Sequence, residues 1–284
     1  MGKMMTLIGT LIVIGIIGGS GYIAFSIFIK TGSNNEMRVR YGDTVHVNYI
    51  GRFETGKIFD TSLWNVAKDD KNFTKALSFA LRAQSDYTPF NFTVGKGTVI
   101  KGWDTGVIDM FVGQTRPLTI PKENAYGDSN PSLIKTLPLV QRVPMTNEMN
   151  LTNFRLKFSV SPEINLEVSD PYWGWTETVV SIVGDAVTTS ASPGVGDVVH
   201  PYKAWSSKVI SVDSSVDGGK GMIEVEHEIT SDMVNNVMEK DSSGGEFFLT
   251  GLSTFHGTFT IDFNREVVGK TLVFTVTLEK IIRT

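Results

Sequence analysis

The chain has 284 residues, a formal charge of −4 and no cysteine, which excludes disulfides, thiolate metal sites and thiol catalysis. Its length exceeds the roughly 100 to 200 residues of one domain, which predicts two folded units or one unit that carries a large insertion. Residues 132–264 hold 8 Lys and Arg against 17 Asp and Glu, a net charge of −9, so this section lacks the clustered basic residues of a nucleic-acid site.

The first predicted element is a membrane anchor. Residues 7–29 are uncharged and largely apolar, with Lys3 before them and Lys30 after them. At about 1.5 Å per residue, a helix of this length crosses a hydrocarbon core of about 30 Å. We therefore predict a transmembrane helix within residues 1–30, followed by a polar linker at residues 31–38.

A cleaved signal peptide is the alternative interpretation of this apolar stretch. Residues 18–21 are small enough for a cleavage site, but residues 22–29 continue apolar where a cleaved segment would turn polar. Basic residues lie on both sides of the stretch, so they barely favour either orientation. A short N-terminal tail ahead of a large C-terminal part is compatible with a single-pass protein whose globular part lies outside the cytoplasm.

Alternating and β-branched residues predict four strands after the linker. Residues 44–53 alternate, with Val45 and Val47 on one face and Ile50 on the other, which indicates a half-buried strand. Further strands are expected at residues 90–94, 116–120 and 272–282.

Helical spacing occurs at two places in the same part of the chain. Ile100, Trp103 and Val107 recur three and four residues apart, which predicts one short amphipathic helix laid across a sheet. The long loop at residues 62–89 holds Phe73, Leu77 and Leu81 at helical spacing, so a second helix is expected at residues 72–81.

Residues 132–264 consist of short β-branched runs interrupted by Gly, Ser, Asp and Pro, which predicts a mostly-β section. Helical spacing is suggested there only at residues 231–239. Pro-Tyr-Trp-Gly-Trp at residues 171–175 recurs as Pro-Tyr-Lys-Ala-Trp at residues 201–205, and each copy precedes a β-branched run. The echo indicates two repeated units, with chance similarity as the alternative. His227, between Glu226 and Glu228, is expected at a solvated strand edge.

Three short motifs are more specific than any other part of the chain. They are Val-x-Tyr-x-Gly at residues 47–51 with Phe59-Asp60, Val-Ile-Lys-Gly-Trp-Asp at residues 99–104, and Ala-Tyr-Gly at residues 125–127. Together they resemble the FK506-binding-protein (FKBP) type of peptidyl-prolyl isomerase over residues 39–131 and 265–284. The resemblance implies an α+β fold, an antiparallel β-sheet wrapped around a short helix, with a mostly-β domain inserted at residues 132–264.

The resemblance also implies a proline-binding pocket of mostly aromatic and apolar side chains. Its counterparts in this chain are Tyr49, Phe59, Asp60, Phe90, Val99, Ile100, Trp103, Tyr126 and Phe274. By this resemblance Trp103 forms the floor, and the Ile100 N–H and the Tyr126 hydroxyl donate to peptide carbonyls. An ordinary aromatic core is the alternative, but the order of these residues and the glycines between them match the family. No cofactor and no metal are implied.

Asp60 is the one ionisable side chain of this set. Rotation about the C–N bond transfers no proton to a side chain, which argues against a general base. We predict instead that Asp60 orients Tyr49 or the strained amide by hydrogen bonding. A structural aspartate that caps the turn after Phe59 is the alternative.

Residues 132–264 occupy the place where archaeal and SlyD-like members carry an insert-in-flap domain, here more than twice the usual size. In that class the insert binds unfolded chain, and aromatic residues such as Trp173 and Trp205 would serve either partner binding or, as the more favoured interpretation, a local core. The sequence thus predicts a monomeric, membrane-anchored isomerase that acts on X-Pro bonds of unfolded or newly exported polypeptides and binds no nucleic acid. A tethered proline-binding or chaperone module with little turnover is the alternative.

Overall fold

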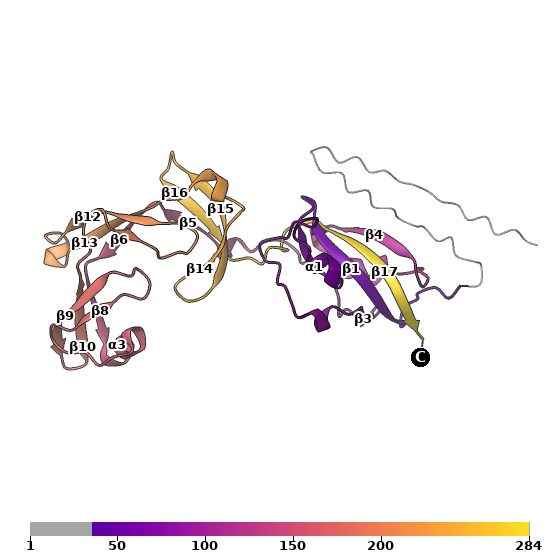
Figure 1. The fold of residues 1–284 in the computed structure, drawn as a ribbon, viewed down its shortest axis with the longest axis horizontal. Coiled ribbons are helices and arrows are strands. Elements are labelled where there is room, and N and C mark those ends of the chain that lie inside the picture. The colour runs from indigo at the N-terminus through magenta and orange to yellow at the C-terminus, as the bar shows by residue number, and fades with distance from the viewer. Residues whose placement is uncertain (1–35, 284) are drawn as a thin grey trace, which may run out of the picture. The chain divides into compact units, whose positions relative to one another are not determined.

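The computed structural model describes residues 36–283 (Figure 1). The anchor predicted at residues 7–29 lies outside these residues. In the described part of the chain, no helix has both the length and the apolar character needed to cross a membrane. The chain divides into two compact units: the first runs to Ser129 and resumes at Arg265, and the second is Asn130–Asn264.

The first unit is an antiparallel sheet of five strands. Its strands and helices are β1 (Thr44–Phe53), β2 (Ile58–Thr61), α1 (Trp64–Ala67), β3 (Phe90–Thr93), α2 (Lys101–Gly106), β4 (Thr115–Ile120) and β17 (Leu272–Ile282). The order is β2-β1-β17-β4. Strands β3 and β2 pair with the same edge of β1, β3 with its first half and β2 with its second half. The four strands predicted from sequence are confirmed to within one residue at each end.

Helix α2 lies against one face of this sheet and closes the main core. Trp103 and Val107 are buried there with Val45, Val47 and Val276. The helix approaches the sheet closely because Gly102 carries no side chain: a Cβ at this position would lie 2.4 Å from Ile120 Cγ2. The amphipathic helix predicted from the spacing of Ile100, Trp103 and Val107 is confirmed.

The half-buried strand predicted at residues 44–53 is confirmed for its first half, where Val45 and Val47 are buried and His46 and Asn48 are partly exposed. Further along, the opposite face of β1 is covered as well. Ile50 is 4% exposed and packs with Ile58 and Val66 in a second cluster. The helix predicted at residues 72–81 is wrong. Turns at residues 71–72 and 77–78 flank one bridge to β2 at Lys75, where the Ile58 N–H donates to Thr74 O at 2.9 Å and the Ala76 N–H donates to Ile58 O at 2.8 Å. This pairing outweighs the weak helical spacing.

The second unit contains three antiparallel sheets of four strands. Its elements are β5 (Ile134–Pro138), β6 (Val140–Pro144), β7 (Thr146–Asn150), α3 (Leu151–Phe158), β8 (Glu167–Ser169), β9 (Thr176–Val183), β10 (Ala186–Ala191), β11 (Val198–Val199), β12 (Ser207–Asp213), β13 (Met222–His227), β14 (Met238–Lys240), β15 (Glu246–Ser253) and β16 (Thr258–Asp262). Residues 231–239, where helical spacing was suggested, form one 3₁₀ turn and the start of β14.

The three sheets share one topology. Each is a three-strand meander completed by one strand of the run β5-β6-β7, giving the orders β7-β10-β9-β8, β6-β13-β12-β11 and β5-β16-β15-β14. The central strand of each meander also carries a bulge at the equivalent pairing. The repeat therefore occurs three times rather than the two suggested by sequence. The earliest strand, β5, pairs with the last, β16, so the sheets are nested along the chain.

Each sheet in this unit is covered on one face by a helix or loop. Helix α3 covers the first sheet, a loop of the first sheet covers the second, and a loop of the second covers the third. Phe154 of α3 covers Val179 and Val187 of the first sheet. Trp173 and Trp175, from the β8–β9 loop of the first sheet, pack on the strands of the second.

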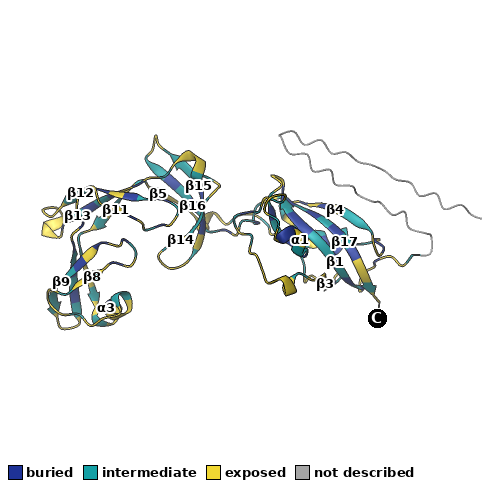
Figure 2. Ribbon diagram, in the orientation of Figure 1, coloured by how far each residue is buried: buried dark blue, intermediate teal, exposed yellow. Residues whose placement is uncertain are grey.

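Tyr202 and Trp205, from the corresponding loop of the second sheet, pack in turn on Phe247 and Leu249 of the third. Both loop pairs are therefore core residues, which confirms the favoured interpretation of these aromatics. Figure 2 shows the buried positions along these strands in dark blue.

His227 corrects another prediction, because it is buried rather than solvated. Strand β13 lies between β12 and β6, and His227 points to its buried face while Glu226 and Glu228 on either side are exposed. The ring nitrogens lie 2.7 Å from Ser207 Oγ and 3.2 Å from Gln141 Oε1, and rings of Tyr202 and Phe259 surround the imidazole. Burial lowers the pKa of His227 to about 4.

We expect this buried histidine to make the second unit acid-sensitive. Its pKa is about 4 when folded and about 6.5 when unfolded, so between these values the unfolded chain binds the extra proton. The contribution of His227 to the unfolding free energy is therefore complete at about pH 7 and above. It falls as the pH drops, by about 2 kcal/mol between pH 7 and pH 5. Urea unfolding of the wild type and of His227→Gln at both pH values measures it. An equal pH dependence in the two proteins would contradict the assignment.

Candidate active site

The centre of the candidate site is a cluster of aromatic rings around Trp103. The Trp103 ring centroid lies 5.1 Å from that of Tyr49, 5.2 Å from Phe274 and 5.7 Å from Phe90. Phe59 joins through Phe274, at 5.4 Å. Most of these contacts are edge-to-face, the arrangement that ring quadrupoles favour. Four strands and α2 thus bring together five residues that are far apart in the sequence.

Gly51 makes this cluster possible. It faces Phe274 in the register of β1 with β17, next to the end of β2 that carries Phe59. A Cβ at Gly51 would lie 2.7 Å from Phe59 Cζ and 2.8 Å from Phe274 Cε1. Because the glycine of the Val-x-Tyr-x-Gly motif has no side chain, the two rings can occupy the space next to it.

A chain of polar contacts lies beside the rings. The Tyr49 hydroxyl donates to Asp60 Oδ2 at 2.5 Å, and Arg82 Nη1 donates to Asp60 Oδ1 at 3.1 Å. Burial, with the neighbouring Asp60 carboxylate, raises the pKa of Tyr49, so the phenol stays protonated and remains a donor. The Thr61 N–H also donates to Asp60 Oδ1, at 2.8 Å. Asp60 thus contacts the Tyr49 hydroxyl and also the backbone N–H of the next residue in β2.

Arg82 was not identified from sequence. It lies in the long loop after α1, where no motif marks it, and its Nη2 also donates to Thr61 O at 2.7 Å. The guanidinium lies 4.9 Å from the Tyr87 ring centroid. Arg82 therefore links the loop to strand β2, which carries Asp60. In the sequence, the only hint of this role is that Tyr87 follows Arg82 by five residues.

We expect Arg82→Met to lower kcat/KM for a proline peptide about two- to fivefold, because Asp60 loses one of the donors that hold it against Tyr49. The unfolding free energy should change by less than about 1 kcal/mol, since both partners are partly solvated. Arg155→Met, an exposed position in α3, is the matched control and should leave kcat/KM unchanged. Equal kcat/KM values for Arg82→Met and the wild type would show that Asp60 does not depend on Arg82.

The remaining predicted residues differ in how closely they join the cluster. Val99 and Ile100 are partly buried against the same core. Ile100 directly precedes α2, and among residues 36–283 no group accepts a hydrogen bond from its N–H. Tyr126 is 42% exposed, and its ring lies 5.1 Å from the Arg265 guanidinium carbon. Within the described residues it has no ring contact with the Trp103 cluster.

The arrangement suits binding and rotation rather than bond cleavage. The ring cluster supplies apolar walls, and its Tyr49 phenol is held protonated. Asp60, the one carboxylate at the rings, is already engaged by three donors. A free N–H at Ile100 remains for a ligand carbonyl. Such a site can enclose an apolar ring and fix an adjacent carbonyl.

Comparison with known proteins supports this description. Residues 35–139 match the family of FKBP-type peptidyl-prolyl cis-trans isomerases. FK506-binding protein 2 of Emericella nidulans is 36% identical over 123 residues, which are 43% of this chain and 76% of that protein. The short-type peptidyl-prolyl cis-trans isomerase of Methanocaldococcus jannaschii is 37% identical over 100 residues, 35% of this chain and 58% of that protein.

A third relative, FK506-binding protein 4 of Gibberella zeae, is 43% identical over 93 residues, and the match spans 33% of this chain but 14% of that protein. All three matches cover less than half of this chain, in keeping with its division into two units. With a third of its length aligned to this family and the ring cluster of its first unit in place, the chain belongs to the FKBP-type peptidyl-prolyl cis-trans isomerase family.

Proposed function

We propose that this protein catalyses cis–trans rotation of X-Pro peptide bonds at the Trp103 ring cluster. The observation that carries the proposal is the buried Trp103 enclosed by the rings of Tyr49, Phe90 and Phe274. The rotation barrier of about 18–20 kcal/mol comes from amide resonance. A twisted amide has a less polar carbonyl than a planar one, so an apolar site favours the transition state relative to water.

Each residue of the site has a role in this proposal. Trp103 is the floor under the proline ring, and Tyr49, Phe59 and Phe274 are walls. Val99 and Ile100 close one side. The free Ile100 N–H donates to a peptide carbonyl, and the exposed Tyr126 hydroxyl reaches a second one, which holds the chain bent around proline. Asp60 acts by positioning the Tyr49 hydroxyl.

The test is acceleration of cis–trans relaxation in a proline peptide, measured after a solvent jump without a coupled protease, with the soluble fragment 31–284. Uncatalysed relaxation takes tens to hundreds of seconds, so catalysis is readily seen. No acceleration would favour the alternative of a tethered proline-binding module with little turnover.

We further propose that the second unit is an enlarged insert-in-flap domain of the archaeal and SlyD-like class that assists folding. The loop aromatics Trp173, Trp175, Tyr202 and Trp205 are buried. Partner binding therefore falls to exposed apolar side chains such as Val183, Val195 and Phe255, which are 72%, 67% and 89% exposed. Deletion is feasible because the ends of the unit meet: the Asn130 N–H donates to Asn264 Oδ1 at 2.9 Å. Removing residues 132–264 should abolish suppression of aggregation and leave short-peptide isomerisation nearly intact. Loss of short-peptide activity would contradict the division of labour.

We also propose that residues 7–29 anchor the protein in a membrane, with the globular part outside the cytoplasm and unfolded or newly exported polypeptides as clients. The support is the length and apolar character of this stretch. Protease added to intact cells should degrade the globular part. Protection in intact cells, with degradation after lysis, would place it in the cytoplasm.

A further inference from the structure

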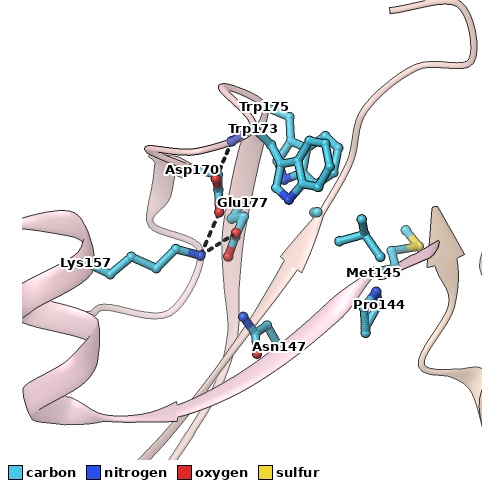
Figure 3. Close-up of a pocket in the computed structure, with 10 residues that line it drawn as sticks. Pro144, Met145, Asn147, Lys157, Asp170, Trp173, Trp175 and Glu177 are labelled. Atoms are coloured by element: carbon cyan, nitrogen blue, oxygen red, sulfur yellow. Dashed lines mark hydrogen bonds and ion pairs between the residues drawn. The ribbon is translucent and has the colours of Figure 1, made fainter. Parts of the chain in front are cut away.

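A lysine in the second unit contacts two buried carboxyl groups. Lys157 of α3 reaches toward the β8–β9 loop and β9, and its Nζ lies 2.7 Å from Asp170 Oδ2 and 2.9 Å from Glu177 Oε1. Figure 3 shows the three side chains converging. The two carboxyl side chains are 5% and 6% exposed, and the lysine side chain is 25% exposed. The three groups therefore meet where water has little access.

Condensation of the lysine with a carboxyl group would remove a cost that the ion pair carries. Taking an ammonium and a carboxylate out of water costs free energy, which their attraction offsets only with good geometry and further hydrogen bonds. An amide between the two side chains has no net charge, so it escapes this penalty. Burial also brings the neutral amine and the neutral acid, the two forms that react, closer in free energy to the ion pair.

The two oxygens of Asp170 have different surroundings. Oδ1 accepts from the backbone N–H groups of Tyr172 and Trp173 at 2.8 and 2.6 Å, whereas Oδ2 faces Lys157 Nζ. Two N–H donors on one oxygen are the arrangement that stabilises an oxyanion in acyl transfer. The carboxyl carbon is one bond of about 1.2 Å beyond the oxygen that Nζ contacts, within reach of the roughly 3–3.5 Å of a near-attack conformer. Asp170 is thus presented as an acyl donor.

Glu177 is placed to carry protons between the lysine and the aspartate. Besides its contact with Lys157 Nζ, it shares a hydrogen bond with Asp170, and Thr189 Oγ1 donates to its Oε2 at 2.5 Å. Burial and the hydrogen bond with Asp170 raise the pKa of Glu177, which makes it a better proton acceptor than an ordinary glutamate. It therefore touches both reacting side chains and can accept and return a proton.

We propose that Lys157 and Asp170 condense to an isopeptide (side-chain amide) bond after folding, with Glu177 as the proton carrier. Glu177 first moves a proton from the lysine ammonium to Asp170 Oδ2, which leaves an amine beside a carboxylic acid. The amine lone pair attacks Asp170 Cγ, and the carbonyl electron pair moves to Oδ1, where the two N–H groups hold the charge. Glu177 takes a second proton from the nitrogen and delivers it to Oδ2. The Cγ–Oδ2 bond breaks, the Oδ1 carbonyl re-forms and one water leaves, so no co-reactant is consumed.

The surroundings suit the departure of water. A cavity of about 120 Å³ borders the three groups, and its lining includes Trp173, Trp175 and Met145. It exceeds the roughly 30 Å³ that one water takes up in the liquid. An aspartate can also lose water by closing onto the next backbone nitrogen, but that reaction needs an N–H, and Pro171 has none. The lysine nitrogen is the nucleophile that remains for Asp170.

The ion pair is the state from which this bond forms. Hydrogen bonds with Glu177, Lys157 and the Trp173 N–H keep the pKa of Asp170 low, so its acid form is scarce and the reaction is slow. The bond links α3 to the β8–β9 loop in a chain without cysteine. It involves no residue of the Trp103 cluster and does not depend on isomerase activity.

The first test is the intact mass of the full chain, measured after denaturation, both freshly purified and after incubation at pH 7. The wild type should be lighter by the mass of one water, and this fraction should rise to completion on incubation. Lys157→Arg keeps a cation that forms no amide, and Glu177→Gln keeps both reacting groups without the proton carrier, so both variants should keep the full mass.

A wild type that keeps its full mass on incubation overturns the proposal, as does an equal loss of water in Lys157→Arg. Loss of water from Glu177→Gln at the wild-type rate overturns the role of Glu177. Because a missing lysine leaves two buried carboxyl groups whether or not the bond forms, mass rather than stability is the measurement that decides.

A tryptic digest of the wild type locates the bond without any variant. Trypsin does not cleave after an acylated lysine, and residues 158–202 contain no Lys or Arg. The bond therefore predicts one peptide of residues 156–203, lighter by one water, with no fragment ions from breaks between residues 157 and 170. Lys122 pairs with Asp128 at side-chain exposures of 43% and 78%, and as the matched control it should be cleaved normally. Complete cleavage after Lys157, or a loss of water located elsewhere, contradicts the bond.

Discussion

Trp103→Ala is expected to lower the unfolding free energy of the first unit by about 3–5 kcal/mol and to abolish isomerisation of a short proline peptide. Trp103 is 4% exposed and contacts the rings of Tyr49, Phe90 and Phe274, so its removal opens a cavity at the centre of the site. Urea unfolding of fragment 31–284 measures the first effect. A protease-free kinetic assay at a temperature where the variant stays folded measures the second.

Trp103→Phe is the matched control. The Trp103 Nε1 is buried without a partner in the described structure, so phenylalanine removes an unsatisfied donor along with part of the ring. The loss of burial and the relief of that donor oppose each other, and the unfolding free energy should fall by less than about 1.5 kcal/mol. If Phe and Ala variants lost equal stability and equal activity, Trp103 would not act through the volume of its ring.

Lys157→Met should destabilise the second unit by about 3–5 kcal/mol at pH 8, because it strands two buried carboxylates. Lys157 Nζ pairs with Asp170 at 2.7 Å and Glu177 at 2.9 Å, and those side chains are 5% and 6% exposed. In the wild type, burial and a hydrogen bond with Asp170 raise the pKa of Glu177, while hydrogen bonds with Glu177, Lys157 and the Trp173 N–H keep the pKa of Asp170 low despite its burial. Urea unfolding followed by tryptophan fluorescence measures the change.

The stability loss caused by Lys157→Met should depend on pH, with a sign that follows from the two carboxyl groups. Without the ammonium, the folded carboxyl pair holds a proton at a pH where the unfolded chain does not, so the stability lost through the substitution shrinks as the pH falls toward 5. The difference from wild type should therefore be smaller at pH 5 than at pH 8. Lys240→Met removes a lysine from an exposed pair with Glu246 and should change stability by less than about 1 kcal/mol. Equal effects of the two substitutions would show that Lys157 is not a buried bridge.

The first unit was largely predictable because its strands carry strong local signals. Residues 44–53 and 272–282 alternate or are β-branched, and both became strands with the bounds expected. The predictions that failed in the first unit concern features that depend on tertiary contacts. Ile50 faces a loop that no periodicity reveals, and residues 72–81 pair with β2 instead of forming a helix. Arg82 reaches Asp60 across 22 residues, a contact that no local pattern encodes.

In the second unit the misses are of two kinds. Helix α3 had a readable signal: Leu151, Phe154 and Phe158 are three and four residues apart, and the Asn150 side chain accepts from the Asn153 N–H at 2.8 Å as an N-cap. His227 had one as well, because Ile223, Val225 and His227 alternate with Glu224, Glu226 and Glu228, which places the histidine on the apolar face of the strand. The third repeat lacks the Pro-Tyr-x-x-Trp loop, since Asp241 to Gly245 takes its place in the hairpin, so the echo revealed only two copies.

The Trp103 cluster is expected to turn over X-Pro bonds rather than merely to hold them. Two-dimensional exchange NMR on one proline peptide with fragment 31–284 measures the cis–trans exchange rate, while the Trp103 indole signal reports occupancy in the same sample. The exchange rate should rise in proportion to protein concentration at low occupancy and return to the uncatalysed value with Trp103→Ala. Saturation of the Trp103 signal with exchange as slow as in free peptide would contradict it.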